Sequence, residues 1–288
     1  MELRHLRAFL AIAEEGSVTA AAVRLHTSQP ALSRTLRQLE DHLHARLVDR
    51  STHHLRLTEA GVAFQVRASV ALTAVDAAFD PAGLGRWPLR LGHAWSALGV
   101  HTTALLRRWD QAFPDMPLEL LRIDDRTAGL AQGKVDAALL RGAVTTPGVR
   151  SVLLRAEPRI AAVPAGSPLA RRETLSLADL TGHVIARNTV SGTTTMELWP
   201  TPIRPADSLE VGNTDDWLAA ISAGRAVGVS AAATADIHPY PGVAYRPLTD
   251  APPVPLQLVW TDPPRHPAIP DLATLIAKVL REGGVEVL

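Results

Sequence analysis

The sequence contains no cysteine, and this absence excludes disulfide bonds, thiolate nucleophiles and zinc sites built on sulfur ligands. No run of about eighteen apolar residues occurs either, so no membrane-spanning helix is expected. Aromatic residues are only 4% of the chain, but apolar residues reach 47%, enough for packed cores. The first residues enter an amphipathic pattern at once, with no signal-peptide segment before them. We therefore expect a cytoplasmic protein.

Net positive charge is also missing, because the 29 basic residues equal the 29 acidic ones. Charge has to be counted by segment, since only the surface that docks on DNA must be positive. Residues 1–58 hold eight arginines and six acidic residues, and six of the eleven histidines. This excess of two positive charges permits DNA binding without demonstrating it. The length of 288 residues predicts two or three domains.

The first segment has the spacing of short helices. Apolar residues recur at helical intervals from Leu3 to Ala13, and Gly16 ends the run. Ser17 is a suitable N-cap for a helix over 18–25, and Ser28 for a third helix with proline in its first turn. One buried stripe is expected on that third helix, formed by Leu32, Leu36, Leu39 and Leu43.

A polar stretch follows, flanked by alternating residues. Segments 48–50 and 55–57 are expected to pair as a two-stranded wing with residues 51–54 at its tip. A long helix over 59–79 comes next, and residues 82–85 form a linker. The long helix carries a stripe that predicts a dimer interface, formed by Val62, Val66, Val70, Thr73 and Ala77.

The remaining chain alternates between strands and helices, which indicates an α/β fold with a mostly parallel sheet. The expected strands span 89–92, 118–123, 135–140, 160–163, 184–186, 227–229 and 256–260. The expected helices span 98–113, 127–130, 177–180, 217–223 and 272–280.

A long string of fixed spacings carries a resemblance to a known family. Its residues are Phe9, Gly16-Ser17, Ala21-Ala22, Leu25, Ser28-Gln29-Pro30-Ala31-Leu32-Ser33-Arg34, Leu39-Glu40 and Leu43, continued by segments 46–50 and 57–61. In these positions the chain resembles the LysR-type transcriptional regulators. Looser matches at 113–114, 133–138 and 223–229 extend the resemblance along the chain. The departures are His44, where the family usually has a helix-terminating glycine, and Val48, where it usually has phenylalanine.

The resemblance implies an N-terminal all-α winged helix-turn-helix, a long linker helix, and a C-terminal α/β effector domain of two subdomains like those of periplasmic binding proteins. The implied ranges are 1–58 for DNA binding, 59–86 for the linker, dimerisation helix and hinge, and 87–288 for effector binding, with subdomain I at about 87–159 and 262–288 and subdomain II at about 160–261. The resemblance also implies a homodimer or homotetramer whose binding to promoter DNA responds to a small-molecule effector.

A helix-turn-helix places the N-terminal part of its second helix in the major groove of DNA. Glutamine can bond an adenine edge in two places, and arginine can do the same to guanine. Hydroxyl groups such as that of Ser33, and the first amides of a helix, can hold phosphate. The predicted DNA contacts are Thr27, Ser28, Gln29, Pro30, Ser33, Arg34, Arg37, Arg50, His53, His54 and Arg56. The alternative is an ordinary amphipathic helix whose polar side only meets solvent.

In open α/β sheets, ligands bind beyond the carboxyl ends of strands, next to helix N-termini. The residues expected to line such an effector cleft are Ala94, Trp95, Ser96, Ala97, Arg141, Asn188, Thr189, Ser191, Gly192, Thr193 and Ser230. Ser96 is placed to receive a carboxylate and Arg141 to supply a positive charge, so a small carboxylate is the candidate effector. Trp95 has an alternative place in the core.

Signs of catalysis are few. Residues 224–228 lack the spacing and the lysine of a phosphate loop, and no serine lies in a nucleophile elbow. His53 and His54 have no third metal ligand nearby. We expect no enzyme activity, cofactor or metal. Two other hypotheses remain open: a ligand-binding or transport module without gene regulation, and a DNA-binding structural protein without an effector.

Overall fold

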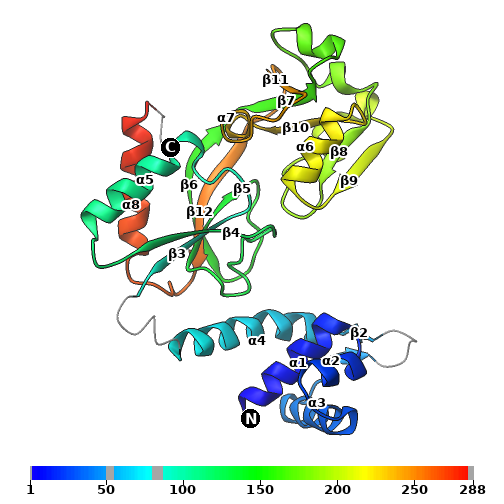
Figure 1. The fold of residues 1–288 in the computed structure, drawn as a ribbon, viewed down its shortest axis with the longest axis vertical. Coiled ribbons are helices and arrows are strands. Elements are labelled where there is room, and N and C mark those ends of the chain that lie inside the picture. The colour runs from blue at the N-terminus through cyan, green and yellow to red at the C-terminus, as the bar shows by residue number, and fades with distance from the viewer. Residues whose placement is uncertain (1, 50–54, 80–86, 285–288) are drawn as a thin grey trace. The chain divides into compact units, whose positions relative to one another are not determined.

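The computed structural model describes residues 2–49, 55–79 and 87–284 (Figure 1). The chain divides into two compact units, residues 1–85 with the short segment 131–134, and residues 86–130 with 135–288. Among the described residues, no helix combines the length and the apolar character that crossing a membrane requires.

The first unit is built of helices and one small hairpin. Its described elements are α1 (Leu3–Glu15), α2 (Val18–Arg24), α3 (Gln29–Leu43), β1 (Val48–Asp49), β2 (Arg56–Leu57) and α4 (Glu59–Ala78). Ser17 and Ser28 each accept a hydrogen bond from a backbone N–H in the first turn of the helix that follows, at 3.3 Å. Gly16 ends α1 in the left-handed conformation. The predicted caps are confirmed.

One apolar core joins the helices of this unit. Leu36 and Leu39 of α3 are fully buried together with Phe9 of α1, so the predicted leucine stripe points inward. Phe64 of α4 meets Phe9 edge to face, with 5.1 Å between the ring centroids. The start of α4 is therefore part of the core of the first unit, and Ala68 extends that contact.

The buried carboxylate of Glu40 holds the predicted wing, the hairpin of β1 and β2, against α3. Glu40 is 3% exposed, and its Oε1 accepts hydrogen bonds from the backbone N–H of Leu47 at 2.8 Å and of Val48 at 3.2 Å. The chain reaches this position by turning at His44, which takes the left-handed conformation with φ 51°. β1 and β2 pair antiparallel, and the predicted wing tip, 51–54, lies outside the described residues.

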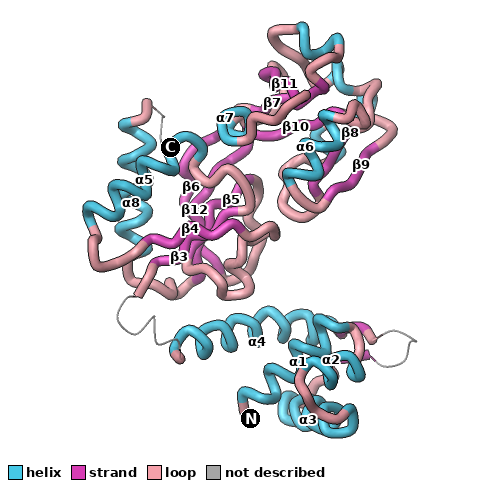
Figure 2. The backbone as a smooth tube through the Cα atoms, in the orientation of Figure 1, coloured by secondary structure: helices cyan, strands magenta, loops and turns pink. Residues whose placement is uncertain are grey.

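The second unit contains two five-stranded sheets (Figure 2). The first has the order β4-β3-β5-β12-β6, and its strands are β3 (Leu89–His93), β4 (Leu118–Arg122), β5 (Ala137–Arg141), β6 (Val149–Glu157) and β12 (Val254–Thr261). The helices α5 (Thr102–Ala112) and α8 (Ile269–Glu282) contact each other beside this sheet (Figure 1). Trp109 and Ile276 are fully buried in the core beneath them.

The second sheet has the order β11-β7-β10-β8-β9. Its strands are β7 (Arg159–Pro164), β8 (Ile185–Asn188), β9 (Ser208–Val211), β10 (Val227–Ala231) and β11 (Val243–Pro247). The helices of this half are α6 (Thr214–Ser222) and α7 (Ala233–Ile237), and the short 3₁₀ turns of the unit are Gly99–His101, Pro168–Arg171, Ala178–Leu180, Met196–Leu198 and Thr201–Ile203.

Both sheets are mixed, so the expectation of a mostly parallel sheet is wrong. β3 runs parallel to β4 and β5, but β12 is antiparallel to β5 and β6. In the second sheet, β7 is antiparallel to β10 and β11. The chain leaves the first sheet at Glu157, enters the second at Arg159 and returns at Val254. A chain that crosses from one sheet to the other and comes back needs strands of opposite direction.

Three further expectations need correction. Segment 127–130 forms turns instead of a helix, because Ala128 and Gly129 take positive φ values of 48° and 86°. Strands β6, β9 and β11 fall where no strand was expected. Residues 254–261, expected in subdomain II, form β12 of the first sheet, where alternate residues such as Leu256 and Leu258 are fully buried.

Replacing Glu40 tests the attachment of the wing. Glu40→Ala leaves two buried backbone N–H groups without an acceptor, so we expect a loss of about 2–3 kcal/mol in the free energy of unfolding. Denaturant unfolding of the full chain measures this loss. Asp41→Ala, at the exposed neighbouring position, is the control and is expected to change stability by less than about 0.5 kcal/mol. Equal effects of the two substitutions contradict this role of Glu40.

Candidate functional site

The first candidate site is the exposed face at the start of α3. Gln29, Pro30, Arg34 and Arg37 are all exposed, as the sequence predicts. Within the described residues, neither arginine forms an ion pair, so both guanidinium groups can meet an external acceptor. The arrangement offers amide and guanidinium donors from one helix face, which are the groups that read adenine and guanine edges.

Ser33 does not belong to this exposed face, and its expected contact with phosphate is corrected. The residue is only 7% exposed, and its hydroxyl accepts a hydrogen bond from Nε2 of Gln29 at 3.2 Å. α3 packs against α1 and α2, and position 33 is one of the buried positions of α3. Ser33 therefore orients the Gln29 amide instead of reaching outward.

The structure describes some of the predicted contacts on the flanks of α3. Thr27 and Ser28 precede the helix and are exposed, and Arg56 is exposed on β2 of the wing. The hydroxyl of Ser28 is used in capping, accepting from the backbone N–H of Ala31. Arg50, His53 and His54 lie outside the described residues.

The second candidate site is a pocket in the second unit, and its empty volume of about 390 Å³ includes the solvent-open space at its mouth. It lies beyond the ends of β3 and β8 and beside β10, α6 and α7. Two indoles and several hydroxyl groups form its wall. The lining residues are Trp95, Ala186, Asn188, Gly192, Thr193, Thr194, Thr214, Trp217, Val229, Ser230 and Thr234.

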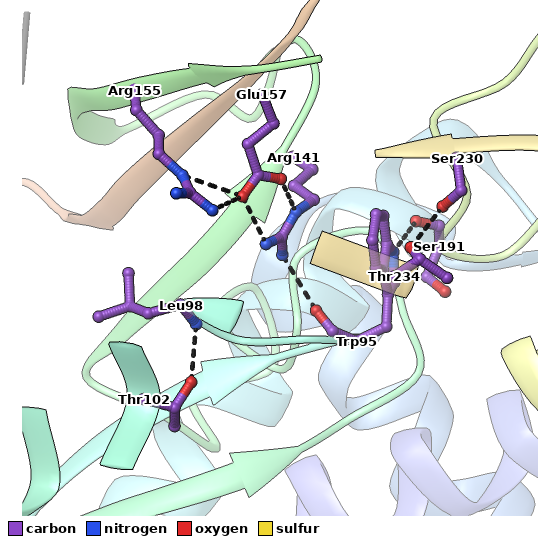
Figure 3. A network of polar contacts seen from close by, with 9 residues as sticks. All are labelled: Trp95, Leu98, Thr102, Arg141, Arg155, Glu157, Ser191, Ser230 and Thr234. Atoms are coloured by element: carbon purple, nitrogen blue, oxygen red, sulfur yellow. Dashed lines mark hydrogen bonds and ion pairs between the residues drawn. The ribbon is translucent and has the colours of Figure 1, made fainter. Parts of the chain in front are cut away.

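Five of the predicted effector residues are brought together in this wall: Trp95, Asn188, Gly192, Thr193 and Ser230. Trp95 is 7% exposed, and its Nε1 donates to the carbonyl of Ser191 at 3.2 Å, which links the two halves of the unit. Ser230 shares a hydrogen bond of 2.7 Å with Thr234 (Figure 3). The indole of Trp95 is thus buried and forms part of the cavity wall.

The other predicted residues lie elsewhere. Ala97 is buried in the core of the first sheet, and Thr189 is an exposed loop residue. Ala94 and Arg141 line a smaller neighbouring cavity, which also contains Trp95 and Ser191. Ser96 is 5% exposed with φ 55°, and its Oγ is buried without a hydrogen-bond partner among the described residues.

Arg141 does not supply a free positive charge, and this expectation is corrected. Its side chain is 2% exposed and forms a two-pronged ion pair with Glu157, at 2.6 and 3.1 Å. Its Nη1 donates to the carbonyl of Trp95 at 3.0 Å, and its guanidinium carbon lies 4.5 Å from the centroid of that indole. Figure 3 shows Arg155 reaching the same carboxylate from the other side. Arg141 therefore positions Trp95.

The ionisation of Glu157 follows from these partners. Burial opposes the charged form, but the arginines Arg141 and Arg155 outweigh it, so the pKa of the carboxyl lies below its ordinary value of 4.5. In His93, unlike in Glu157, the uncharged form is favoured. Burial, helped by the charges of Arg122 and Arg141, lowers the pKa of His93 to about 4, so this side chain is neutral at physiological pH.

Sequence reasoning missed the part of the cavity built around α6. Thr214 and Trp217 follow β9, a strand that was not expected, so no strand end pointed to them. Trp217 is held by a hydrogen bond from its Nε1 to the carbonyl of Ala186 at 2.9 Å. Gly228 lies against this ring, and a Cβ there would be 2.2 Å from it. The glycine inside a strand pattern was the available signal for a close approach.

Comparison with known proteins identifies two family domains along the chain. Residues 3–62 match the family described as bacterial regulatory helix-turn-helix protein, lysR family, and residues 82–281 match the LysR substrate binding domain. The fold is similar to the crystal structure of full-length BenM, with a TM-score of 0.56 and 26% identity over 99% of each chain.

Two curated relatives are similar in sequence. The chain is 35% identical over 190 residues to YnfL, an HTH-type transcriptional regulator of Escherichia coli, covering 62% of this chain and 63% of the relative. It is 34% identical over 175 residues to BenM, an HTH-type transcriptional regulator of Acinetobacter baylyi, covering 59% of this chain and 57% of the relative. The chain thus spans less than two thirds of the length of these relatives.

Removing Arg141 tests the ion-pair network. Arg141→Met leaves the buried Glu157 carboxylate with Arg155 alone, and we expect it to lower the free energy of unfolding by about 3 kcal/mol. Arg150→Met, which breaks an exposed pair with Asp262, is the matched control, with an expected loss below about 1 kcal/mol. Similar losses in both variants, measured by denaturant unfolding, contradict the network.

The same network predicts a pH dependence. Because the pKa of Glu157 is lower in the folded chain than in the unfolded one, its stabilisation is present above the ordinary carboxyl value of 4.5. That stabilisation is lost as the pH falls through the folded pKa. The stability difference between wild type and Arg141→Met should therefore shrink in acid, and a difference independent of pH would contradict the assignment.

Proposed function

Because the chain belongs to the LysR family of bacterial helix-turn-helix regulators, we propose that it regulates transcription by binding promoter DNA and by responding to a small-molecule effector. The exposed start of α3 carries this proposal, because Gln29, Arg34 and Arg37 present donors on one face without ion-pair partners within the described residues. BenM and YnfL are both named as HTH-type transcriptional regulators.

The proposed functions of the three segments follow their order along the chain. Residues 1–58 bind DNA, residues 59–86 link and dimerise, and residues 87–288 bind the effector in the cavity beside Trp95. Thr27, Ser28, Gln29, Arg34, Arg37 and Arg56 are the proposed DNA contacts among the described residues, and Pro30 packs beside them. The protein acts in the cytoplasm, where its DNA lies, and it is not an enzyme.

The effector acts by preferring one arrangement of the second unit. Two hydrogen bonds join the halves across the cavity region, from Trp95 to the Ser191 carbonyl and from Arg126 to the Thr189 carbonyl at 3.3 Å. A ligand that contacts both halves favours the arrangement in which these bonds form. Its preference for that arrangement is the free energy available for the switch.

A second candidate, a ligand-binding module without DNA, is opposed by the first unit. Its helices have the caps, spacing and exposed donors of a DNA reader, and residues 3–62 match a DNA-binding family. A structural DNA-binding protein without an effector is opposed by the pocket of the second unit, whose wall carries two indoles and several hydroxyl groups.

The DNA-reading face is tested by substitution. Arg34→Ala and Gln29→Ala remove proposed base contacts, so each should weaken binding to the specific site by about 1–3 kcal/mol while leaving unrelated DNA nearly unchanged. Fluorescence anisotropy with the upstream region of the protein's own gene measures both affinities. Arg24→Ala, whose guanidinium pairs with Glu14 away from this face, is the control. Unchanged preference in both variants contradicts this use of α3.

Dimerisation is proposed to use the free side of α4. Val62 and Val66 of the predicted stripe are 53% and 45% exposed, although both are large and apolar. Val70 is half-buried, and the side chain of Ala77 lies outside the part of the chain that the structure describes.

Placing carboxylates on that side should separate the subunits. Val62→Asp combined with Val66→Asp buries two charges in the proposed interface, and light scattering is expected to show a monomer. Ala71→Asp, which lies on another exposed side of α4, should leave the mass unchanged. A double variant with the wild-type mass would place the interface elsewhere.

A further inference from the structure

Two histidines approach each other from the two halves of the second unit, which are built on the first and the second sheet. His93 is the last residue of β3, and His238 directly follows α7. α7 packs against the turn Gly99–His101, which leads into α5 of the first half. A charge on His238 acts on His93 and lowers the pKa of its imidazole. The two side chains therefore lie where the halves contact each other.

Each imidazole keeps one nitrogen buried without a hydrogen-bond partner among the described residues. The two atoms are Nδ1 of His93 and Nε2 of His238. A neutral imidazole tolerates this position, because its single N–H can lie on the other nitrogen. A protonated imidazole has an N–H on both nitrogens, so one donor would be buried without an acceptor. The contact as it stands therefore accommodates the neutral forms only.

The charges around this contact oppose protonation as well. Burial is the largest cause that lowers the pKa of both imidazoles, and Arg122 and Arg141 lower it further. Asp124 acts in the opposite sense on the first histidine, and Asp215 does so on the second. Both carboxylates lie near the guanidinium of Arg122, with Nη2 to Oδ2 distances of 3.3 Å and 3.9 Å. Their negative charge is thus shared with an arginine that is already present.

The other titratable groups on the elements packed at this contact are Tyr245, His101 and Asp236. Tyr245 of β11 donates its hydroxyl to the carbonyl of His238 at 2.6 Å, and burial raises the pKa of this phenol to about 12, so it is uncharged. His101 has a pKa lowered by burial and by the charge of Arg155. Asp236 is exposed on α7, where solvent screens its charge. None of the three places a buried negative charge beside the histidines.

We propose that His93 and His238 form a proton-operated contact: the halves stay closed while both imidazoles are neutral, and proton binding separates them. Separation brings both nitrogens to water, where a protonated imidazole is hydrated and finds acceptors. In the closed arrangement its charge would be held beside Arg122. The proton is then a ligand that prefers the separated arrangement. This inference goes beyond the proposed function, because it involves neither DNA nor a small molecule.

The direction of the pH response follows from linkage. In the separated arrangement the imidazoles take the ordinary histidine pKa of 6.5, whereas in the closed one the pKa of His93 is about 4. The closed arrangement therefore keeps its full advantage above about pH 6.5 and loses it progressively as the pH falls toward 4. Carboxyl groups titrate mostly near pH 4, so a window from about pH 7.5 to about pH 5 isolates the histidines.

The labelling rate of a buried cysteine measures how often the halves separate. Ala233 of α7 is 3% exposed, and its Cβ is 3.3 Å from where a Cβ on Gly99 would lie, so Ala233→Cys places a thiol inside the contact. The full-length chain has no other cysteine to react. Labelling is followed with a maleimide at both pH values. Ala178→Cys, at an exposed position, corrects for the fraction of thiolate at each pH.

The corrected rate of Ala233→Cys should rise roughly tenfold from about pH 7.5 to about pH 5. This is less than the full shift of His93 implies, because solvent screens the charge of a part-buried group. His93→Gln and His238→Gln cannot take up a proton, so each should remove part of the rise and the double variant should remove it. His183→Gln, which replaces an exposed histidine of the same unit, is the matched control and should rise like wild type.

A second buried cysteine separates this motion from unfolding. Ala161 is fully buried in the core of the second sheet, so Ala161→Cys reacts only when that core opens. It should react far more slowly than Ala233→Cys at both pH values. Equal rates at the two positions, a corrected rate of Ala233→Cys that does not change with pH, or an undiminished rise in the double glutamine variant each overturn the proposal.

Discussion

The buried ion pair between Glu157 and Arg141 is the interaction on which the second unit depends. Glu157 is the last residue of β6, at the point where the chain leaves the first sheet, and Arg141 is the last residue of β5. Their pairing fixes a guanidinium under the ring and carbonyl of Trp95, and Trp95 in turn forms the cavity wall and donates across to Ser191. The same residues therefore set the charge where the chain passes between the sheets, the shape of the cavity wall and a contact between the two sheets.

The first unit uses a buried carboxylate in a similar way. Glu40 on α3 accepts from two backbone N–H groups of the segment that leads into the wing, so the recognition helix and the wing keep one relative position. Recognition then depends on where donors are held, since the unit has only a small positive excess. Ser33 contributes from inside, by orienting the amide of Gln29.

Local signals predicted the first unit well. Ser17, Ser28 and Gly16 act through contacts within a few residues, so caps and helix ends could be derived from spacing alone. The second unit was harder, because β6, β9 and β11 contain mixed polar and apolar residues and take their strand form from neighbours distant in sequence. Five of the residues expected beyond the strand ends line the cavity, namely Trp95, Asn188, Gly192, Thr193 and Ser230. The strand ends could not show that Arg141 is neutralised, because the partner Glu157 is sixteen positions away and becomes a neighbour only through β12.

The same limit applies to the burial of Arg159. In the sequence this residue reads as the charged start of a strand, and only the fold shows that it is buried without an acidic partner.

We propose that this chain reads DNA sequence with a nearly neutral domain. The most direct measurement is the ratio of its affinities for its own upstream region and for an unrelated duplex of equal length, followed over a range of salt concentrations. Base contacts predict a ratio of about 10³ or more that persists as salt rises, because salt weakens mainly the phosphate contacts common to both duplexes. A ratio near one at every salt concentration would contradict the account.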